Sequence, residues 1–374
     1  MGAPAADMPA RSAHASQPLP SIQILRALAA LSVMTVHTAL PGHVTGGAGV
    51  DLFFVISGFI MVYASEPLFG RRDAPRIFFL RRVVRIVPLY WAATATLVGI
   101  LLHLRGDLVG MRGMIIASFA FFPYPAPDGR MVPLHVLGWT LNYEMFFYAV
   151  FAGAMVLSRR RTVLAIVILF AAAVALGLAF KLPQPFAFWS DPIILEFCFG
   201  MLLALAYREG VQLPYAASVG LMLAGALGFV ASAFFDDSMA WRTIAWGVPA
   251  TAVLAGSVLS KESPTPAPLA RTFVFLGDAS YSLYLVHYVV LALLPQSRLR
   301  WFEAAPEWSY GLFLMAASIA IAVMVYLLFE NPTRRWLQAR LRIDRRRPGV
   351  QDVRGEQHDV YRPVPAVQPL GEPR

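Results

Sequence analysis

Ten apolar runs, each long enough or nearly long enough to cross a lipid bilayer, occupy most of this chain. Hydrophobic residues make up 58% of its 374 residues and charged residues 14%, whereas soluble domains have about 45–50% and about 25%. The sequence therefore predicts an all-α, polytopic membrane protein of about ten transmembrane helices. The runs cover residues 21–40, 49–65, 86–104, 137–157, 163–180, 192–207, 214–233, 243–259, 275–294 and 308–329.

The loops between these runs differ in arginine content, and this difference predicts the orientation. Loops such as "FGRRDAPRIFFLRRVVR" and "SRRRT" carry most of the positive charge, and such loops stay in the cytoplasm. One further apolar segment, 114–125, is short and interrupted by proline. We interpret it as re-entrant or interfacial, because counting it as a span would place the later basic loops on the opposite side. Ten spans then leave both termini in the cytoplasm.

The two ends of the chain are polar and differ from the apolar middle. We expect a disordered lead at 1–20, a transmembrane domain at 21–335, and a disordered, basic and Pro-rich tail at 336–374. The net charge of +9 resides in loops and tail rather than in a basic groove, so nucleic acid is not an expected partner. The single cysteine, Cys198, excludes an intrachain disulfide framework, and we expect no metal site.

Titratable residues inside spans are functional candidates, because each needs a partner or a water-filled cavity. A rise of 1.5 Å per residue places Glu144 and His287 about 10 Å from the outer ends of their spans, while His37 and Asp51 lie near the outer ends of theirs. Two imidazoles and two carboxylates at a similar depth in the membrane suit acid–base chemistry on a hydroxyl. Structural roles stay open: Asp51 as a helix N-cap, His37 as a satisfied interfacial histidine, Glu144 as an arginine partner, and His287 bound by nearby hydroxyls.

A basic group lies toward the cytoplasmic side of the same bundle. Arg26 is about one turn into the first span, and Arg81, Arg82 and Arg85 precede the third. Arg82 and Arg85 are three residues apart, so they project from one helical face, and arginine forks suit phosphates. The alternative is that these arginines set the topology and reach lipid phosphates.

Six segments together resemble the acyltransferase family 3 integral membrane proteins, over most of residues 21–335. They are the ten-residue spacing of Arg26 and His37 in "RALAALSVMTVH", "GVDLFFVISGF", the Arg82/Arg85 pair, "GWTLNYEMFFY", "SYSLYLVH" and "FENPTRRW". The segments "GVDLFFVISGF" and "GWTLNYEMFFY" are most similar to those of the exopolysaccharide O-acetyltransferase branch. We expect no SGNH-type hydrolase domain after the membrane part, unlike in some relatives.

The resemblance implies a multi-pass enzyme of the bacterial inner membrane that transfers an acyl group from cytoplasmic acyl-CoA, commonly acetyl-CoA, to a hydroxyl of a cell-surface or exported polysaccharide. It implies His37 as catalytic residue with Arg26 as its motif partner, and Arg82 and Arg85 as donor-binding residues. Because Arg26 belongs to the same basic group, we expect it to bind the donor as well. We expect Asp51 or Glu144 to orient His37.

We expect the acceptor to contact three further side chains. These are His287, Tyr284 and Trp139, although Tyr and Trp near span ends also serve as interfacial anchors. The open alternatives are a transporter or flippase of a glycan precursor, and acylation of a lipid-linked or small-molecule acceptor. The sequence does not indicate an oligomeric state.

Overall fold

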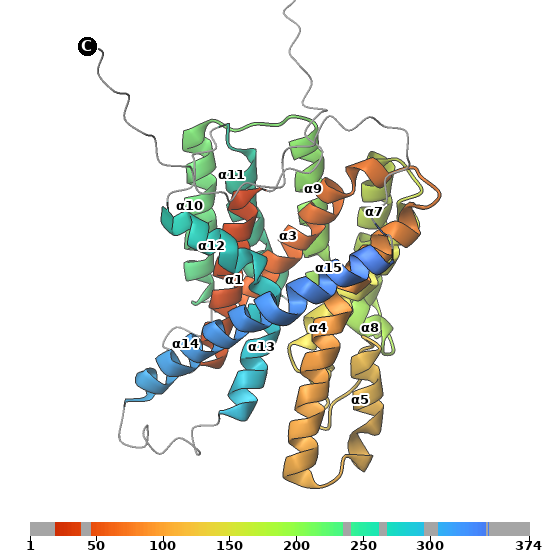
Figure 1. Cartoon of the computed structure of the whole chain (residues 1–374). Helices are drawn as coiled ribbons and strands as arrows, with labels where there is room; N and C mark the ends of the chain where they lie inside the picture. Colours follow the sequence, from red (N-terminus) through yellow and green to blue (C-terminus); the bar gives the residue numbers. More distant parts are fainter. Residues whose placement is uncertain are drawn as a thin grey trace, which may run out of the picture.

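The computed structural model describes residues 19–38, 46–234, 241–261, 268–294, 306–341 and 343, and within these ranges its regular elements are all helices. The predicted all-α class is thus confirmed (Figure 1). Most of the predicted lead and tail lies outside the described residues. The helices are α1 (Pro20–His37), α3 (Ala48–Ala64), α4 (Ala74–Arg105), α5 (Arg112–Phe119), α6 (Gly138–Ala154), α7 (Arg159–Ala179), α8 (Phe186–Trp189), α9 (Leu195–Arg208), α10 (Tyr215–Ser232), α11 (Val248–Leu259), α12 (Pro268–Asp278), α13 (Ser280–Leu293), α14 (Glu307–Val325) and α15 (Asn331–Arg340).

Several described helices are long and apolar enough to cross a membrane. Four meet this test by length and composition, and a fifth does if the bent pair α12–α13, with 67° between its halves, counts as one span. The four are Ala74–Arg105, Arg159–Ala179, Tyr215–Ser232 and the continuous Trp308–Arg340. The membrane character is therefore supported, while the count of ten spans and the cytoplasmic termini remain predictions.

The first part of the proline-interrupted segment at 114–125 lies in the short helix α5, which runs beside α4 (Figure 1). Its eight residues extend about 12 Å, which is too short for a bilayer core of about 30 Å. Trp91 of α4 donates a hydrogen bond from Nε1 to the Phe119 carbonyl at 2.9 Å and so attaches α5 to α4. The segment is not a span of its own.

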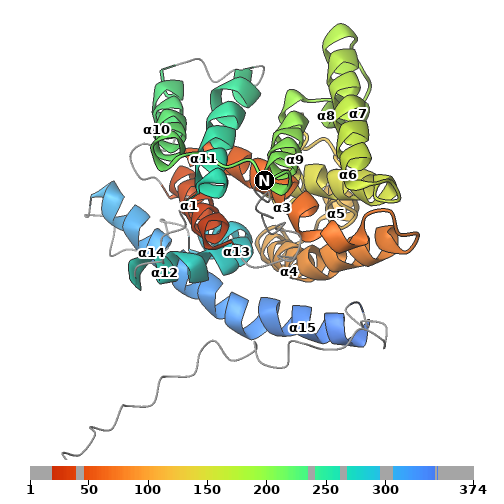
Figure 2. The same cartoon turned by 90° about the horizontal axis from the view of Figure 1, so that it is seen from above.

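Helix α3 lies in the interior of the bundle, between α1 and α9 (Figure 2). Two glycines allow it to pack closely against α9. A Cβ atom on Gly58 would overlap the Phe197 carbonyl, and one on Gly200 would overlap the Val55 carbonyl. Small residues let helix backbones approach in this way where lipid provides no hydrophobic driving force. The close contact fixes the position of α3, which carries two of the site residues described below.

Helix α14 continues through a π-helical turn, Tyr326–Glu330, into α15. This long helix crosses the face of the molecule and contacts α4 (Figure 1). Because α15 ends at Arg340, ordered helix extends beyond residue 336, where the sequence predicted the start of a disordered tail. Glu330, at the end of the turn, is buried and accepts a hydrogen bond from Ser282 Oγ at 2.6 Å.

Candidate active site

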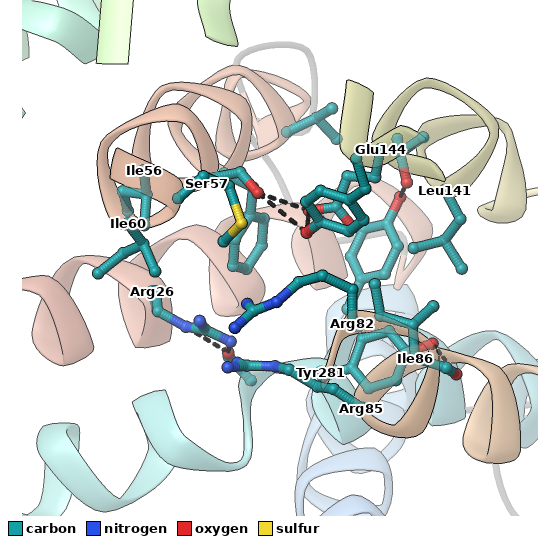
Figure 3. A pocket seen from close by; sticks show the side chains of 17 residues that line it. Arg26, Ile56, Ser57, Ile60, Arg82, Arg85, Ile86, Leu141, Glu144 and Tyr281 are labelled. Atoms are coloured by element: carbon teal, nitrogen blue, oxygen red, sulfur yellow. Dashed lines mark hydrogen bonds between the residues drawn. The ribbon is translucent and has the colours of Figure 1, made fainter. Parts of the chain in front are cut away.

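Three arginines predicted to bind the donor line one cavity inside the bundle (Figure 3). Arg26 comes from α1, and Arg82 and Arg85 come from α4, so the bundle joins residues far apart in sequence. Arg26 donates from Nε and Nη2 to Ser280 Oγ at 3.1 and 2.8 Å. The Nε atom of Arg82 is buried without a hydrogen-bond partner. Among the described residues, none of the three has a carboxylate within 4 Å.

Glu144 lines the same cavity from α6. Its Oε1 atom accepts hydrogen bonds from Ser57 Oγ at 2.8 Å and from Tyr148 Oη at 2.9 Å (Figure 3). The depth estimate from the sequence had grouped Glu144 with the histidines, whereas the structure places it on the wall of the arginine cavity. The cavity therefore holds three cations and one anion, and its charge favours a polyanionic ligand.

The predicted histidines form a pair next to this cavity. His37, at the end of α1, and His287, in α13, have ring centroids 5.5 Å apart. Nδ1 of the fully buried His287 donates to the Leu283 carbonyl at 2.8 Å, since a carbonyl oxygen only accepts. Nε2 of His287 is then an acceptor, and it is buried without a partner. The tautomer of His287 is thus fixed by its own helix.

His135 is a buried histidine that the sequence analysis missed. It lies in the loop before α6, outside the predicted spans, so a search for titratable residues within spans passed over it. Its ring centroid is 5.4 Å from that of Tyr288, which in turn is 6.1 Å from that of His37. His135 Nε2 donates to the Leu285 carbonyl at 3.2 Å, which leaves Nδ1 as a buried acceptor without a partner.

Asp51 is fully buried and is bound by Arg242, not by His37. Arg242 donates from Nε to Oδ1 at 3.0 Å and from Nη2 to Oδ2 at 2.8 Å. The guanidinium carbon also lies 5.5 Å from the Trp139 ring centroid and 4.6 Å from that of Trp246. Asp51 and Trp139 thus belong to one cluster around Arg242. The sequence analysis missed Arg242 because this residue directly precedes a predicted span, and only titratable residues inside spans were candidates.

Tyr284 connects the cavity with the histidine pair. It is one of the cavity-lining residues, and its ring centroid is 6.5 Å from that of His287. Its hydroxyl lies 2.9 Å from Thr140 Oγ1 and 3.1 Å from the Leu137 carbonyl, to which it donates. Within the described part of the chain, no three His, Cys, Asp or Glu side chains are arranged to hold a metal ion.

Comparison with known proteins gives a match to the acyltransferase domain family over residues 19–327. The chain is 35% identical over 302 residues to the exopolysaccharide production protein ExoZ of Rhizobium meliloti, covering 79% of this chain and 92% of ExoZ. It is 26% identical to the acyltransferase MdmB of Streptomyces mycarofaciens, covering 86% of this chain and 93% of MdmB. It is 24% identical to the peptidoglycan O-acetyltransferase OatA of Listeria monocytogenes, covering 85% of this chain and 56% of OatA. No solved structure gives a significant match.

Proposed function

The chain belongs to the acyltransferase domain family, as its sequence motifs predicted, and from this premise we propose that it is a multi-pass enzyme of the inner membrane. In this proposal it moves an acyl group, commonly acetyl, from cytoplasmic acyl-CoA to a hydroxyl of an exported polysaccharide. The family and the named O-acetyltransferase relative identify an O-acyltransferase, which argues against the transporter alternative. The donor, the acceptor and the residue roles below are our proposal.

The observation that carries the proposal is the arginine cavity. Arg26, Arg82 and Arg85 line it, and within the described part of the chain none of them has a carboxylate within 4 Å, so their charges are available to a ligand. The phosphates of acyl-CoA are multiply charged, and the planar guanidinium groups of arginine bind phosphate with two parallel hydrogen bonds. The pantetheine arm would then extend through the cavity toward Tyr284 and the histidines.

The reaction needs a base near the thioester carbonyl, and the histidine pair lies beside Tyr284, one of the cavity-lining residues. We assign His37 as the base that takes the proton from the acceptor hydroxyl. The hydroxyl oxygen attacks the thioester carbonyl carbon, the carbon–sulfur bond breaks, and the thiolate of CoA takes the proton from the imidazolium. His287 Nε2, an acceptor without a partner among the described residues, would receive a hydrogen bond from a neighbouring hydroxyl of the acceptor.

The two carboxylates have supporting roles in this scheme. Glu144 fixes the Ser57 and Tyr148 hydroxyls on the cavity wall. Asp51 neutralises Arg242, whose guanidinium packs on Trp139, and Trp139 is our proposed contact for the sugar ring of the acceptor. The sequence-based hypothesis had Asp51 or Glu144 orient His37. We now assign Glu144 to the wall of the arginine cavity and Asp51 to the cluster around Arg242, and in this scheme neither orients His37.

The donor assignment is tested by acyl-CoA binding to purified protein. We expect Arg82→Ala/Arg85→Ala to weaken acetyl-CoA binding by about 100-fold or more, because each charged hydrogen bond contributes about 1.5–3 kcal/mol. The matched control is Arg160→Ala/Arg161→Ala, which removes the same charge from two exposed arginines at the start of α7. Wild-type affinity in the first double variant would refute the donor site.

The acceptor and base are tested in cells that express His37→Ala at wild-type abundance. We expect the acyl-ester content of the exported polysaccharide to fall to that of cells without the protein. His103→Ala, which changes an exposed histidine of α4, is the control. Unchanged ester content in the His37 variant would remove it from the catalytic machinery.

A further inference from the structure

The segment "FENPTRRW" resembles the family but has no role in the function proposed above. Its glutamate, Glu330, is buried at the end of the π-helical turn that joins α14 to α15. Glu330 Oε2 accepts the hydrogen bond from Ser282 Oγ at 2.6 Å. Ser282 is two residues from Ser280, the cavity-lining residue that Arg26 binds. The segment therefore packs against the part of α13 that adjoins the arginine cavity.

Arg334 lies on the same side of this segment as Glu330. The two residues are four apart along one continuous helix, so their side chains leave the same helical face. Arg334 donates from Nη2 to Asn331 Oδ1 at 2.9 Å, while its Nε atom is buried and has no hydrogen-bond partner among the described residues. Arg335, the next residue, points about 100° away around the helix and is exposed. Arg334 is thus directed toward the bundle, and Arg335 is not.

Electrostatic interactions connect Arg334 with the arginine cavity. Three arginines, Arg26, Arg85 and Arg334, act on the same two carboxylates. These carboxylates are Asp278, at the end of α12, and Glu330. Within the described part of the chain, neither carboxylate comes within 4 Å of an arginine, so no close ion pair neutralises this group. Helix α15 also contacts α4, which carries Arg85 (Figure 1).

Arg334 extends this basic group away from the histidine pair. Asp278, on which Arg334 acts, precedes Ser280 by two residues. Tyr284 follows Ser280 by four residues and is the cavity-lining residue beside His287. Because these residues follow one another along α12 and α13, Asp278 and Tyr284 lie on opposite sides of Ser280. Arg334 therefore adds positive charge at the side of the cavity that is remote from the histidines.

This position suits one group of the donor, an inference that rests on the function proposed above. CoA carries a pyrophosphate and, on its ribose, a separate 3′-phosphate. The 3′-phosphate is the charged group farthest along the molecule from the thioester, and arginine binds phosphate oxygens with two parallel hydrogen bonds. We propose that Arg334 forms a separate phosphate subsite, which binds the 3′-phosphate of acyl-CoA. The enzyme then distinguishes CoA from derivatives that lack this phosphate.

The test is calorimetric binding of CoA and of 3′-dephospho-CoA, which lacks only this phosphate, to the purified full-length protein. We expect wild type to bind CoA about tenfold or more tightly, since charged hydrogen bonds contribute on that order. Arg334→Ala should lower the affinity for CoA to near that for 3′-dephospho-CoA and leave the latter unchanged. The matched control is Arg335→Ala, which removes the same charge from the exposed neighbouring position and should keep the wild-type ratio.

The affinity for 3′-dephospho-CoA also reports whether each variant is folded. Arg334→Gln, which keeps a polar side chain beside Asn331, is a second variant in case the alanine variant binds neither compound. Equal affinity of wild type for the two compounds would overturn the inference, as would parallel loss of both affinities in both Arg334 variants. A wild-type ratio in those variants would also overturn it, and would leave Arg334 as a contact for lipid phosphates. Failure of CoA to bind wild type would instead overturn the proposed function, and this inference with it.

Discussion

Replacing Asp51 by asparagine should destabilise the protein, because Asp51 forms a buried ion pair. Both oxygens of Asp51 accept hydrogen bonds from Arg242, at 3.0 and 2.8 Å, and the exposed fractions of the two side chains are 0% and 13%. Removing one partner of a buried ion pair costs about 3–5 kcal/mol when the other charge is left without compensation, and here Arg242 keeps its interactions with Glu196 and Asp191. The Trp246 ring, 4.6 Å from the Arg242 guanidinium carbon, stays in place, so we expect about 3 kcal/mol.

The assay is reversible unfolding of purified protein by SDS in mixed micelles, which gives the free energy of unfolding of each variant. Asp128→Asn is the control, because its partner Arg130 is equally close, at 2.7 Å, but both side chains are at least half exposed. We expect that variant to unfold like wild type. The double variant Asp51→Asn/Arg242→Gln should lose less free energy of unfolding than the sum of its single variants, because Asp51 and Arg242 contact each other directly.

The result that would refute this reasoning is a normal free energy of unfolding for Asp51→Asn. If that variant were also inactive in acyl transfer, the carboxylate would have a chemical role instead of an anchoring one, as the sequence analysis first suggested.

Three further predictions concern the cavity, the missed histidine and the helix contacts. Glu144→Gln should tighten CoA binding severalfold in calorimetry, because it removes the negative charge on the wall of a cavity that holds three arginines; weaker binding would contradict this. His135→Phe should leave the affinity for acetyl-CoA unchanged and lower acylation of the polysaccharide, because His135 lies outside the donor cavity and beside Tyr288; the reverse pattern would place His135 in the donor site. Gly200→Ala should lower the free energy of unfolding by about 1–3 kcal/mol, because its Cβ would meet the Val55 carbonyl, whereas Gly153→Ala, in open space on α6, should not lower it.

The positions of the helices could be predicted well from the sequence. The second apolar run, 49–65, corresponds to α3 at Ala48–Ala64. The run 163–180 ends one residue after the last residue of α7, Ala179. Such runs are long and uniform, and a single run can satisfy its own backbone groups in lipid only as a helix. The short segment at 114–125 was also interpreted correctly as no span of its own, because its length and prolines are local properties.

The grouping of the site residues could be predicted only in part. The arginine group was anticipated, because Arg82 and Arg85 share a helical face and Arg26 lies at a similar depth. Depth alone, however, does not say which way a side chain faces around its helix. Glu144 was therefore grouped with His37 although it lines the arginine cavity, and Asp51 was matched with a histidine although Arg242 binds it.

The sequence by itself determined the helical class, the family and the residue types of the chemistry, because hydrophobic length and short motifs are properties of contiguous residues. Only the tertiary structure decided which charges meet. Arg242 is 191 residues from Asp51, and Arg26 is 254 residues from Ser280, so these contacts depend on how helices pack and rotate against one another. The close contact of α3 with α9 at Gly58 and Gly200 contributes to this packing. It requires glycine on both helices, and a single apolar run does not indicate which helix it will pack against.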